Sequence, residues 1–364
     1  MIIISYIVLG FLILRIFIAA LNIISRQWLI PKSITEEPFI SILIPARNEE
    51  KNIGNLINNI LNQDYQNYEV IIYDDMSDDA TPVIINKYVE KSDKIRFVAG
   101  KELPGGWLGK NYACHQLSLK AQGSYFLFLD ADVIIENGLI GNSLWYLLNK
   151  DIALLSIFPQ QEMITTGEKL TVPLMNWILV SLLPLVLVEY TSDTSLSAAN
   201  GQFMLFKADI YRKNQWHEKA KGHKVEDIEI VKLIKRKGYK AKTLISNGQI
   251  KCRMYNNYKE SIEGFSKNVI AFFGNSIILT SLFTLITTFG IFIIIFASNY
   301  LLALIFVILS ILLRMLVSIL SRQSVLYNVL LIIPQQITFI FVVLKAFYNK
   351  SVKYGNWKNR AIEF

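Results

Sequence analysis

Acidic side chains follow two short apolar runs at the point where each run ends. Asp74 and Asp75 come directly after the run YEVIIY, and Asp130 and Asp132 come after the run YFLFL. The D-x-D spacing lets two carboxylates in one turn reach one hard divalent cation, which can also take phosphate oxygens as ligands. Such a pair alone is a weak signal, because carboxylates often cap turns and helix starts. Two acidic pairs at strand ends of one sheet favour a site for a metal ion and a nucleoside diphosphate.

A glycine-rich segment, PGGWLGKN (104–111), precedes a helical stretch that we expect to begin at about Asn111. Glycines let the backbone approach a ligand closely, and Lys110 near a helix start could meet a phosphate. An ordinary flexible loop explains the same residues equally well.

A third acidic pair, Glu226 and Asp227, opens the predicted helix DIEIVKLIKRKGY. Acidic residues are favoured in the first turn of a helix on electrostatic grounds alone, so a capping role explains them. Alternatively, one carboxylate serves as a general base that takes the proton from an acceptor hydroxyl. The spacing in the sequence does not choose between these roles.

The elements that must position these residues alternate between strand and helix. Residues at 53, 56, 57, 60 and 61 are apolar with helical spacing, and β-branched runs lie before and after them. Strands separated by helices indicate right-handed β-α-β units and a mostly parallel sheet, whose ligands bind at the carboxyl ends of the strands. The predicted strands are 40–44, 68–73, 95–98 and 125–129, and a second helix includes 84–89.

Apolar residues concentrate in the two ends of the chain, although the whole chain is only 52% hydrophobic with a mean hydropathy of +0.36. The run 2–24 is long enough to cross a membrane as a helix, and it lacks the basic start and cleavage site of a signal peptide. Arg15 inside this run is costly unless it packs on another helix or reaches the interface. Three further apolar runs, which read as membrane helices, lie near 276–297, 299–320 and 326–348.

These patterns predict the following organisation. A membrane anchor (1–26) precedes an α/β domain (39–268), in which 169–190, broken by two prolines, is a candidate interfacial or re-entrant element; membrane helices (276–348) and a basic tail (349–364) follow.

The number of membrane spans conflicts with the charges of the tail. If the first helix places the α/β domain in the cytoplasm, three further spans put the basic tail outside, against the positive-inside rule. The run 326–348 has Pro334 near its middle, so we expect it to be re-entrant or interfacial. That arrangement returns Trp357, Lys358 and Arg360 to the cytoplasmic side.

Lysine and arginine exceed aspartate and glutamate by eight, 37 against 29. The basic residues gather beside the apolar ends, where anionic head groups and the positive-inside rule explain them, so we expect no nucleic-acid partner. Cys114 and Cys252 match no metal or redox spacing and are expected to be buried thiols.

The motifs ISILIPARNEE, VIIYDDMSDDAT, GKN, LDAD and VED, in this order, resemble those of family-2 glycosyltransferases of the GT-A fold. The resemblance covers about 39–268. It implies a Rossmann-like fold, an inverting reaction, a UDP-sugar donor and Mg²⁺ or Mn²⁺. It also implies roles for individual residues. Pro45, Arg47 and Glu49 would lie at the uridine-binding edge, Asp74 or Asp75 would contact the nucleoside, and Lys110 would approach the nucleotide. Asp130 and Asp132 would bind the metal and the diphosphate, and Asp227 would be the catalytic base with Glu226 beside it.

Within this family, PGGWLGKNYACHQL, CRMYNNYKESIEGFSKN and YGNWKNRAIEF are similar to segments of carotenoid-acid and other lipid glycosyltransferases of the 4,4'-diaponeurosporenoate type. This similarity implies a lipid-like acceptor and glucose as the sugar. Processive relatives carry Q/R-x-x-R-W, of which only Arg253 is present here, so polymer synthesis is disfavoured. Arg253 is expected to meet the diphosphate.

Two alternatives stay open. One is a polyprenyl-phosphate or polysaccharide glycosyltransferase. The other, from a different class, is a non-catalytic membrane protein that binds a nucleotide sugar. The leading expectation is a multi-pass protein of the cell membrane, with a catalytic domain on the cytoplasmic side that binds a nucleotide sugar and a lipid acceptor.

Overall fold

The computed structural model describes residues 2–297, 299–352, 356–357 and 360–361. It forms two compact units, which we call the sheet unit (27–160 and 185–252) and the helical unit (1–26, 161–184 and 253–364). The predicted α/β domain, 39–268, stays a prediction; its residues 161–184 and 253–268 belong to the helical unit. Of the predicted basic tail, Lys353 and Lys358 lie outside the described residues.

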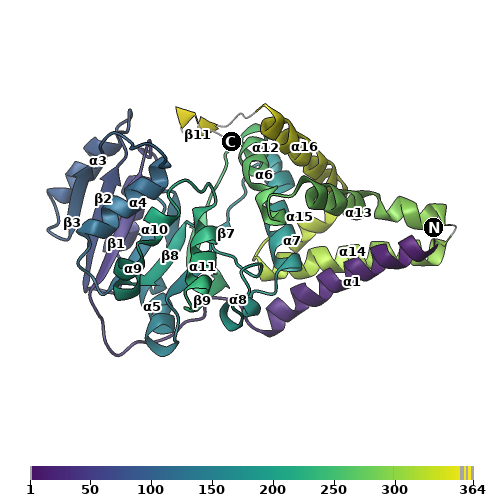
Figure 1. Cartoon of the computed structure of the whole chain (residues 1–364), viewed down its shortest axis with the longest axis horizontal. Coiled ribbons are helices and arrows are strands. Elements are labelled where there is room, and N and C mark those ends of the chain that lie inside the picture. The colour runs from purple at the N-terminus through teal and green to yellow at the C-terminus, as the bar shows by residue number, and fades with distance from the viewer. Residues whose placement is uncertain (1, 298, 353–355, 358–359, 362–364) are drawn as a thin grey trace. The chain divides into compact units, whose positions relative to one another are not determined.

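A seven-stranded sheet in the order β3-β2-β1-β4-β8-β6-β9 forms the core of the sheet unit (Figure 1). Neighbouring strands are parallel except where β8 pairs with β4 and β6, which confirms the mostly parallel sheet. The four predicted strands are all present. The strands are β1 (Ile40–Ala46), β2 (Tyr68–Asp74), β3 (Ile95–Ala99), β4 (Tyr125–Leu129), β6 (Leu154–Phe158), β8 (Phe203–Lys207) and β9 (Ala241–Ile245).

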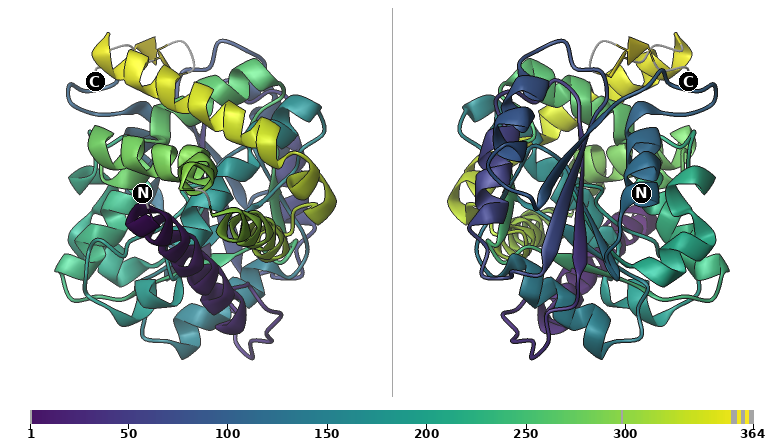
Figure 2. Two further views of the ribbon diagram at one scale, coloured as in Figure 1. Left: turned by 90° about the vertical axis from the view of Figure 1, so that its right-hand side faces the viewer. Right: turned by 90° about the vertical axis from the view of Figure 1, so that its left-hand side faces the viewer.

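Helices connect the strands and cover the sheet (Figure 2). The helix that follows β1 buries Ile53, Leu56, Ile57 and Ile60, the apolar face that its spacing predicts. A short antiparallel pair joins β5 (Val133–Ile135) to β10 (Ile250–Cys252). The helices of this unit are α2 (Ile53–Leu61), α3 (Thr81–Val89), α4 (Gly109–Lys120), α5 (Leu139–Asn149), α8 (Val186–Tyr190), α9 (Ala208–Asn214), α10 (Trp216–Lys219) and α11 (Glu226–Arg236).

The order of the strands reverses beside β1. The chain passes from β1 to β2 and β3 on one side and then returns to β4 on the other side. Since crossovers between parallel strands are right-handed, α2 and α3 cover one face of the sheet and α4 the other. The carboxyl ends of β1 and β4 therefore flank the position where doubly wound sheets bind ligands.

Among the described residues of the helical unit, four helices are long and apolar enough to cross a membrane. These helices are α1 (Ile2–Ile24), α13 (Ile277–Phe296), α14 (Tyr300–Leu320) and α16 (Ile332–Ser351). Figure 2 shows α1 in dark purple with the green and yellow helices of the same unit. The shorter elements of the unit are α6 (Thr166–Thr171), α7 (Pro173–Leu182), α12 (Tyr258–Asn268), a 3₁₀ turn (Ala271–Phe273), α15 (Val325–Leu330), β11 (Asn356–Trp357) and β12 (Arg360–Ala361). The strand β7 (Gln160–Gln161) lies where the chain passes from the sheet unit to the helical unit.

Two predicted apolar runs are subdivided in the structure. The run 326–348, which was expected to have Pro334 near its middle, forms two helices, α15 and α16. Pro334 lies in the first turn of α16. The absent N–H of a proline costs little in a first turn. The run 169–190 is distributed over α6, α7 and α8, with Pro173 at the start of α7.

The short helix α7 packs beside the last turns of α1 within the helical unit. Asn22 donates hydrogen bonds of 2.9 Å to the carbonyl oxygens of Val180, in the last turn of α7, and of Leu183, just after this helix. These bonds satisfy carbonyl groups that a helix end leaves without partners. The expectation that 169–190 is an interfacial or re-entrant element stays a prediction.

Candidate active site

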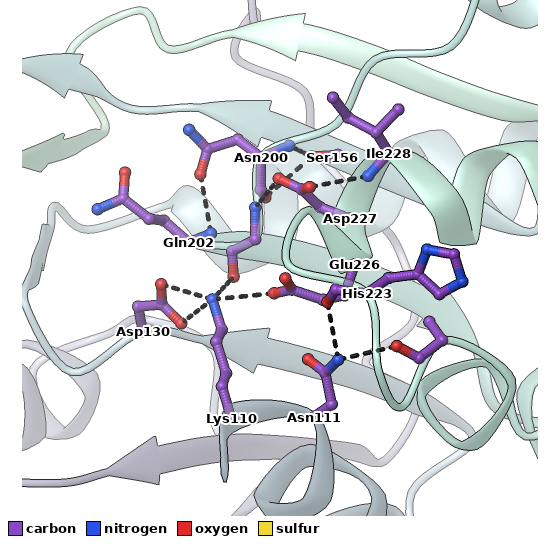
Figure 3. Close-up of polar contacts among 12 residues, drawn as sticks. Lys110, Asn111, Asp130, Ser156, Asn200, Gln202, His223, Glu226, Asp227 and Ile228 are labelled. Atoms are coloured by element: carbon purple, nitrogen blue, oxygen red, sulfur yellow. Dashed lines mark hydrogen bonds and ion pairs between the residues drawn. The ribbon is translucent and has the colours of Figure 1, made fainter. Parts of the chain in front are cut away.

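A lysine joins two of the predicted acidic groups in the sheet unit (Figure 3). Lys110, the second residue of α4, places its Nζ 2.8 Å from the carboxylate of Asp130, which follows β4. The same Nζ lies 3.4 Å from Oε1 of Glu226 at the start of α11. Burial by itself would lower the pKa of Lys110, but the carboxylates of Asp130 and Glu226 hold it well above its usual value. Lys110 is therefore a fixed positive charge at the carboxyl end of β4.

Gly201 lies between Lys110 and Glu226, in the turn before β8. A Cβ atom at this position would lie 2.8 Å from Lys110 Nζ and 3.1 Å from Glu226 Oε1. The carbonyl oxygen of Gly201 is also 3.4 Å from Lys110 Nζ. Only glycine lets the backbone pass this closely without displacing the charged groups.

The carboxylate of Asp227 is fixed by two backbone groups. Its Oδ2 accepts a hydrogen bond of 3.0 Å from the N–H of Gly201, and its Oδ1 accepts one of 2.8 Å from the N–H of Ile228. Burial, followed by the adjacent charge of Glu226, raises the pKa of Asp227 to about 7. A carboxyl group that titrates near neutral pH is suited to general-base catalysis.

The side chain of Asp132 contacts the side chain of Gln202. The amide Nε2 of Gln202 is 3.4 Å from Asp132 Oδ1 and 2.8 Å from the sulfur of Cys252. Burial, and then the charge of Asp132, raise the pKa of the Cys252 thiol well above its usual value. Cys252 is therefore a neutral thiol in this environment.

Asp130 and Asp132 fit a hard divalent cation. They supply two carboxylates from one turn, and among the described residues no cluster of three or more histidine, cysteine or acidic side chains could hold a metal ion by itself. Mg²⁺ and similar ions are commonly held by one or two carboxylates together with substrate phosphates. The donor set thus suits a cation that binds with a diphosphate and not a permanently bound structural metal.

The predicted nucleoside residues meet where β1 and β2 end. Ala46 lies opposite Asp74 in the parallel ladder, and Arg47 donates to the carbonyl oxygens of Asp75 and of Met76, the second at 3.0 Å. Arg47 thus joins the two loops. Oδ1 of Asp74 is buried and accepts no hydrogen bond within the described structure. It is consequently an acceptor that a bound nucleoside can satisfy.

The other predicted residues have different surroundings. Pro45 is part-buried within β1, and the carboxylate of Glu49 accepts a 2.8 Å hydrogen bond from the side chain of Asn52 just before α2. Arg253 belongs to the helical unit, where its Nε donates to Glu168 at 2.9 Å. The predicted contact of Arg253 with a diphosphate stays a prediction.

Several positioning residues were missed in the sequence. Asn111 donates to the carbonyl oxygens of Ala220, Lys221 and His223 at 2.9, 3.1 and 3.1 Å, which ties the loop before α11 to α4. Asn200 and Gln202 fix the turn around Gly201, since the N–H of Gln202 donates to Asn200 Oδ1 at 2.8 Å. Both predicted buried thiols, Cys114 and Cys252, are indeed buried and form no disulfide.

The fold resembles a solved glycosyltransferase structure over almost the whole chain. A mannosyltransferase from Pyrobaculum calidifontis, in complex with GDP-Man and Mn²⁺, superposes with a TM-score of 0.59 and 17% identity, covering 96% of this chain and 98% of that one. The mostly parallel sheet with a carboxylate cluster at its strand ends is the GT-A fold of glycosyltransferases.

Sequence comparison finds similar proteins within this class. Residues 41–213 match the model of Glycosyl transferase family 2. The 4,4'-diaponeurosporenoate glycosyltransferase of Staphylococcus haemolyticus is 30% identical over 240 residues, which cover 63% of this chain and 60% of that protein. The beta-monoglucosyldiacylglycerol synthase of Trichormus variabilis is 36% identical over 105 residues, 28% of this chain and 22% of that protein. The chain thus matches three fifths or less of the length of these curated relatives.

Proposed function

We propose that the chain transfers a sugar, with glucose the first candidate, from a UDP-sugar to a lipid-like acceptor such as a carotenoid acid. The name of the Staphylococcus haemolyticus relative supports this acceptor class, as do the four apolar helices. The observation that carries the proposal is the cluster of Lys110, Asp130, Glu226 and Asp227, because it places a fixed cation beside a carboxyl group with a pKa of about 7.

Asp227 is the general base of the proposed reaction. An oxygen atom of the acceptor attacks the anomeric carbon of the sugar. Where this oxygen belongs to a hydroxyl group, its proton passes to Asp227; where it belongs to a carboxylate, no proton has to be removed. The new bond joins the acceptor oxygen to the anomeric carbon, while the bond from that carbon to the phosphoryl oxygen breaks and its electrons leave with the diphosphate. Direct attack opposite the leaving group inverts the configuration. Lys110 supplies a positive charge that stabilises the charge developing on the leaving group.

Asp130 and Asp132 would hold Mg²⁺ or Mn²⁺ in this proposal. The cation, when bound, would neutralise the negative charge of the departing diphosphate. Lys110 already neutralises part of the charge of Asp130, so the two carboxylates do not present two full negative charges to each other. Asp74 would receive a hydrogen bond from the nucleoside on its free Oδ1.

A transfer assay on the full chain in neutral detergent tests the proposal. UDP-glucose, Mn²⁺ and lipid extracts containing carotenoid acids are expected to give one apolar glycosylated product, and GDP-mannose serves as the competing donor. Asp132→Asn should reduce transfer about a hundredfold or more while thermal unfolding stays unchanged, because the variant keeps its shape and loses a metal-binding charge. Absence of transfer with every nucleotide sugar, or full activity of Asp132→Asn, would refute the assignment.

We also propose that the sheet unit lies on the cytoplasmic side of the membrane. Arg26 follows α1 and Arg322 follows α14, whereas the described residues between α13 and α14 carry no charge. The positive-inside rule then places the ends of α1 and α14 in the cytoplasm.

The surroundings of α16 support an interfacial position for this helix. Its Thr338 lies 3.1 Å from the hydroxyl of Tyr258, and its Asn349 donates to Ser266 at 3.3 Å, so α16 runs along α12. Helix α12 exposes Lys259 and Glu260, which would be costly inside the hydrocarbon. A helix that follows α12 along its length is therefore better placed at the membrane surface.

A further inference from the structure

Two arginines are buried among the apolar helices of the helical unit. Arg15 lies nine residues before the end of α1, and Arg314 lies six residues before the end of α14. Their relative exposures are only 2% and 4%. Charged side chains in such helices are costly and usually face a functional partner.

Both guanidinium groups contact the same aromatic ring. The guanidinium carbons of Arg15 and Arg314 each lie 4.3 Å from the ring centroid of Trp177 in α7. They are therefore separated by no more than twice that distance. Arg15 also donates to Ser181 Oγ at 2.7 and 3.0 Å and to the carbonyl oxygen of Trp177 at 3.0 Å.

The part of this unit that the structure describes offers neither arginine a negative charge. No ion pair among the described residues includes Arg15 or Arg314. The helices α1, α7, α13, α14 and α16 contain no aspartate or glutamate. Neutral oxygens and an aromatic face stabilise a cation, but they do not remove the repulsion between two like charges held this close. Buried charges in proteins are normally paired, so two buried cations without a neighbouring anion are unusual.

An oxyanion would complete this cluster. Guanidinium groups bind carboxylates and phosphates through paired N–H donors, and Arg314 makes no hydrogen bond from its side chain to any described residue. The surrounding side chains are apolar: the ring of Phe283 lies 5.4 Å and that of Phe339 5.7 Å from Trp177. Such surroundings suit a ligand with one charged end and a hydrocarbon body.

We propose that Arg15, Trp177 and Arg314 form a binding site for the oxyanion head of a lipid, either a carboxylate or a phosphate, within the helical unit. This inference goes beyond the proposed sugar transfer, and it needs neither the donor nor the carboxylate cluster of the sheet unit. Its test is a binding measurement without nucleotide sugar, so failure of the transfer assay leaves the lipid site untouched and failure of binding leaves the transfer proposal untouched.

Binding of cis-parinaric acid to the full chain in neutral detergent provides the first test. This polyene carboxylate accepts energy from tryptophan, so its binding is followed by the loss of protein fluorescence. We expect the acid to bind at least about tenfold more tightly than its uncharged methyl ester, a difference of about 1.4 kcal/mol. Equal affinities for the acid and the ester in the wild-type chain would overturn the proposal, and this comparison requires no variant.

Substitutions locate the site. Arg314→Met should abolish the preference for the acid, and Arg314→Lys, which keeps the charge, should retain most of it. Arg322→Met is the matched control, because it removes one exposed arginine just beyond the end of the same helix. A preference for the acid that survives in Arg314→Met, or that is lost equally in Arg322→Met, would refute the assignment.

Thermal unfolding distinguishes the sources of the oxyanion. Laurate and dodecyl phosphate are compared with inorganic phosphate at equal concentration. We expect at least one of the two amphiphiles to raise the Tm of the wild-type chain and of Arg322→Met but not that of Arg314→Met, and the larger rise identifies the head group. An equal rise with inorganic phosphate would replace the lipid with a free anion and overturn the proposal.

Discussion

At the scale of single residues, the proposed reaction depends on the protonation state of Asp227. Its folded-state pKa of about 7 lies above the ordinary value of an aspartate, because burial and then Glu226 disfavour its charge. The base is therefore protonated and inactive below neutral pH. With a hydroxyl acceptor, kcat/KM should rise about tenfold per pH unit up to about pH 7 and then level off. Asp227→Asn should remove this rise together with most of the activity.

The neighbour of Asp227 provides a sharper form of this prediction. Glu226→Gln removes a negative charge that raises the pKa of Asp227, so the activity should reach its plateau at lower pH. Glu229→Gln, one turn farther along α11, is the control that should leave the profile in place. A profile of kcat/KM that is unchanged in Glu226→Gln would show that Asp227 is not the titrating group.

The same profile reports the class of acceptor. A carboxylic acid is already ionised near neutral pH, so it needs no base to remove a proton. If the acceptor is a carotenoid acid that reacts through its carboxylate, the rise below pH 7 should be absent and Asp227→Asn should retain transfer. A requirement for Asp227 therefore indicates a hydroxyl acceptor.

Gly201 is a second residue at which a small change has a large expected effect. The added methyl group of Gly201→Ala would meet Lys110 Nζ at 2.8 Å and push it from its position between Asp130 and Glu226. Because the end of a lysine side chain moves easily, the fold should survive while turnover falls by roughly tenfold to a hundredfold. Gly105→Ala, where no atom lies within 4 Å of the new Cβ, is the control for steady-state kinetics. Equal turnover in the two variants would contradict this role.

The carboxylates were predictable at the residue scale, whereas their supports were not. Asp130 follows β4, and Asp227 lies in the first turn of α11; the apolar pattern of the sequence predicts both elements. Gly201 and Asn111 act on groups 91 and 109 positions away, a distance that only the folded chain closes. Arg253 shows the converse, because its motif predicted a diphosphate contact and its observed partner is Glu168.

At the scale of elements, strands were easier to predict than the ends of helices. Every residue of β2 is buried, and the residues from Val70 to Tyr73 form an apolar run that ends at Asp74. Helix α4 begins at Gly109, two residues before the expected start at Asn111, because glycine and lysine give no capping signal. The structure of the run 169–190 was hard to predict, because its apolar residues are divided between α7, in the helical unit, and α8, in the sheet unit.

Asn111 links two elements and offers a test of stability. Its side chain donates to three carbonyl oxygens of the loop 220–223, and it is buried. Asn111→Ala leaves these acceptors without their partner and should lower the free energy of unfolding by about 1–3 kcal/mol. Chemical denaturation measures this loss. Asn149→Ala, which removes an exposed 3.0 Å hydrogen bond within α5, should change the stability by less than about 0.5 kcal/mol, and similar losses in both variants would contradict the linking role.

At the scale of the whole molecule, the proposed membrane orientation is open to labelling. Single cysteines introduced as Tyr300→Cys, Arg322→Cys and Lys350→Cys are treated with a membrane-impermeant thiol reagent, and the native cysteines are buried. Tyr300→Cys should react in intact cells, whereas Arg322→Cys and Lys350→Cys should react only after permeabilisation. Reaction of Lys350→Cys from outside would show that α16 crosses the membrane and that its interfacial assignment is wrong.

The order of the two units along the chain has a consequence for how the protein is made. The chain passes from one unit to the other four times, after residues 26, 160, 184 and 252. During translation, α1 emerges before the sheet unit, which stays incomplete until β9 has been synthesised, after α7. The ribosome therefore delivers an apolar segment of the helical unit before β8 and β9 of the sheet have been synthesised. Removing both ends of the chain would leave residues 161–184 inside any excised catalytic fragment. A soluble version consequently requires redesign of an internal segment, and trimming the termini alone will not produce one.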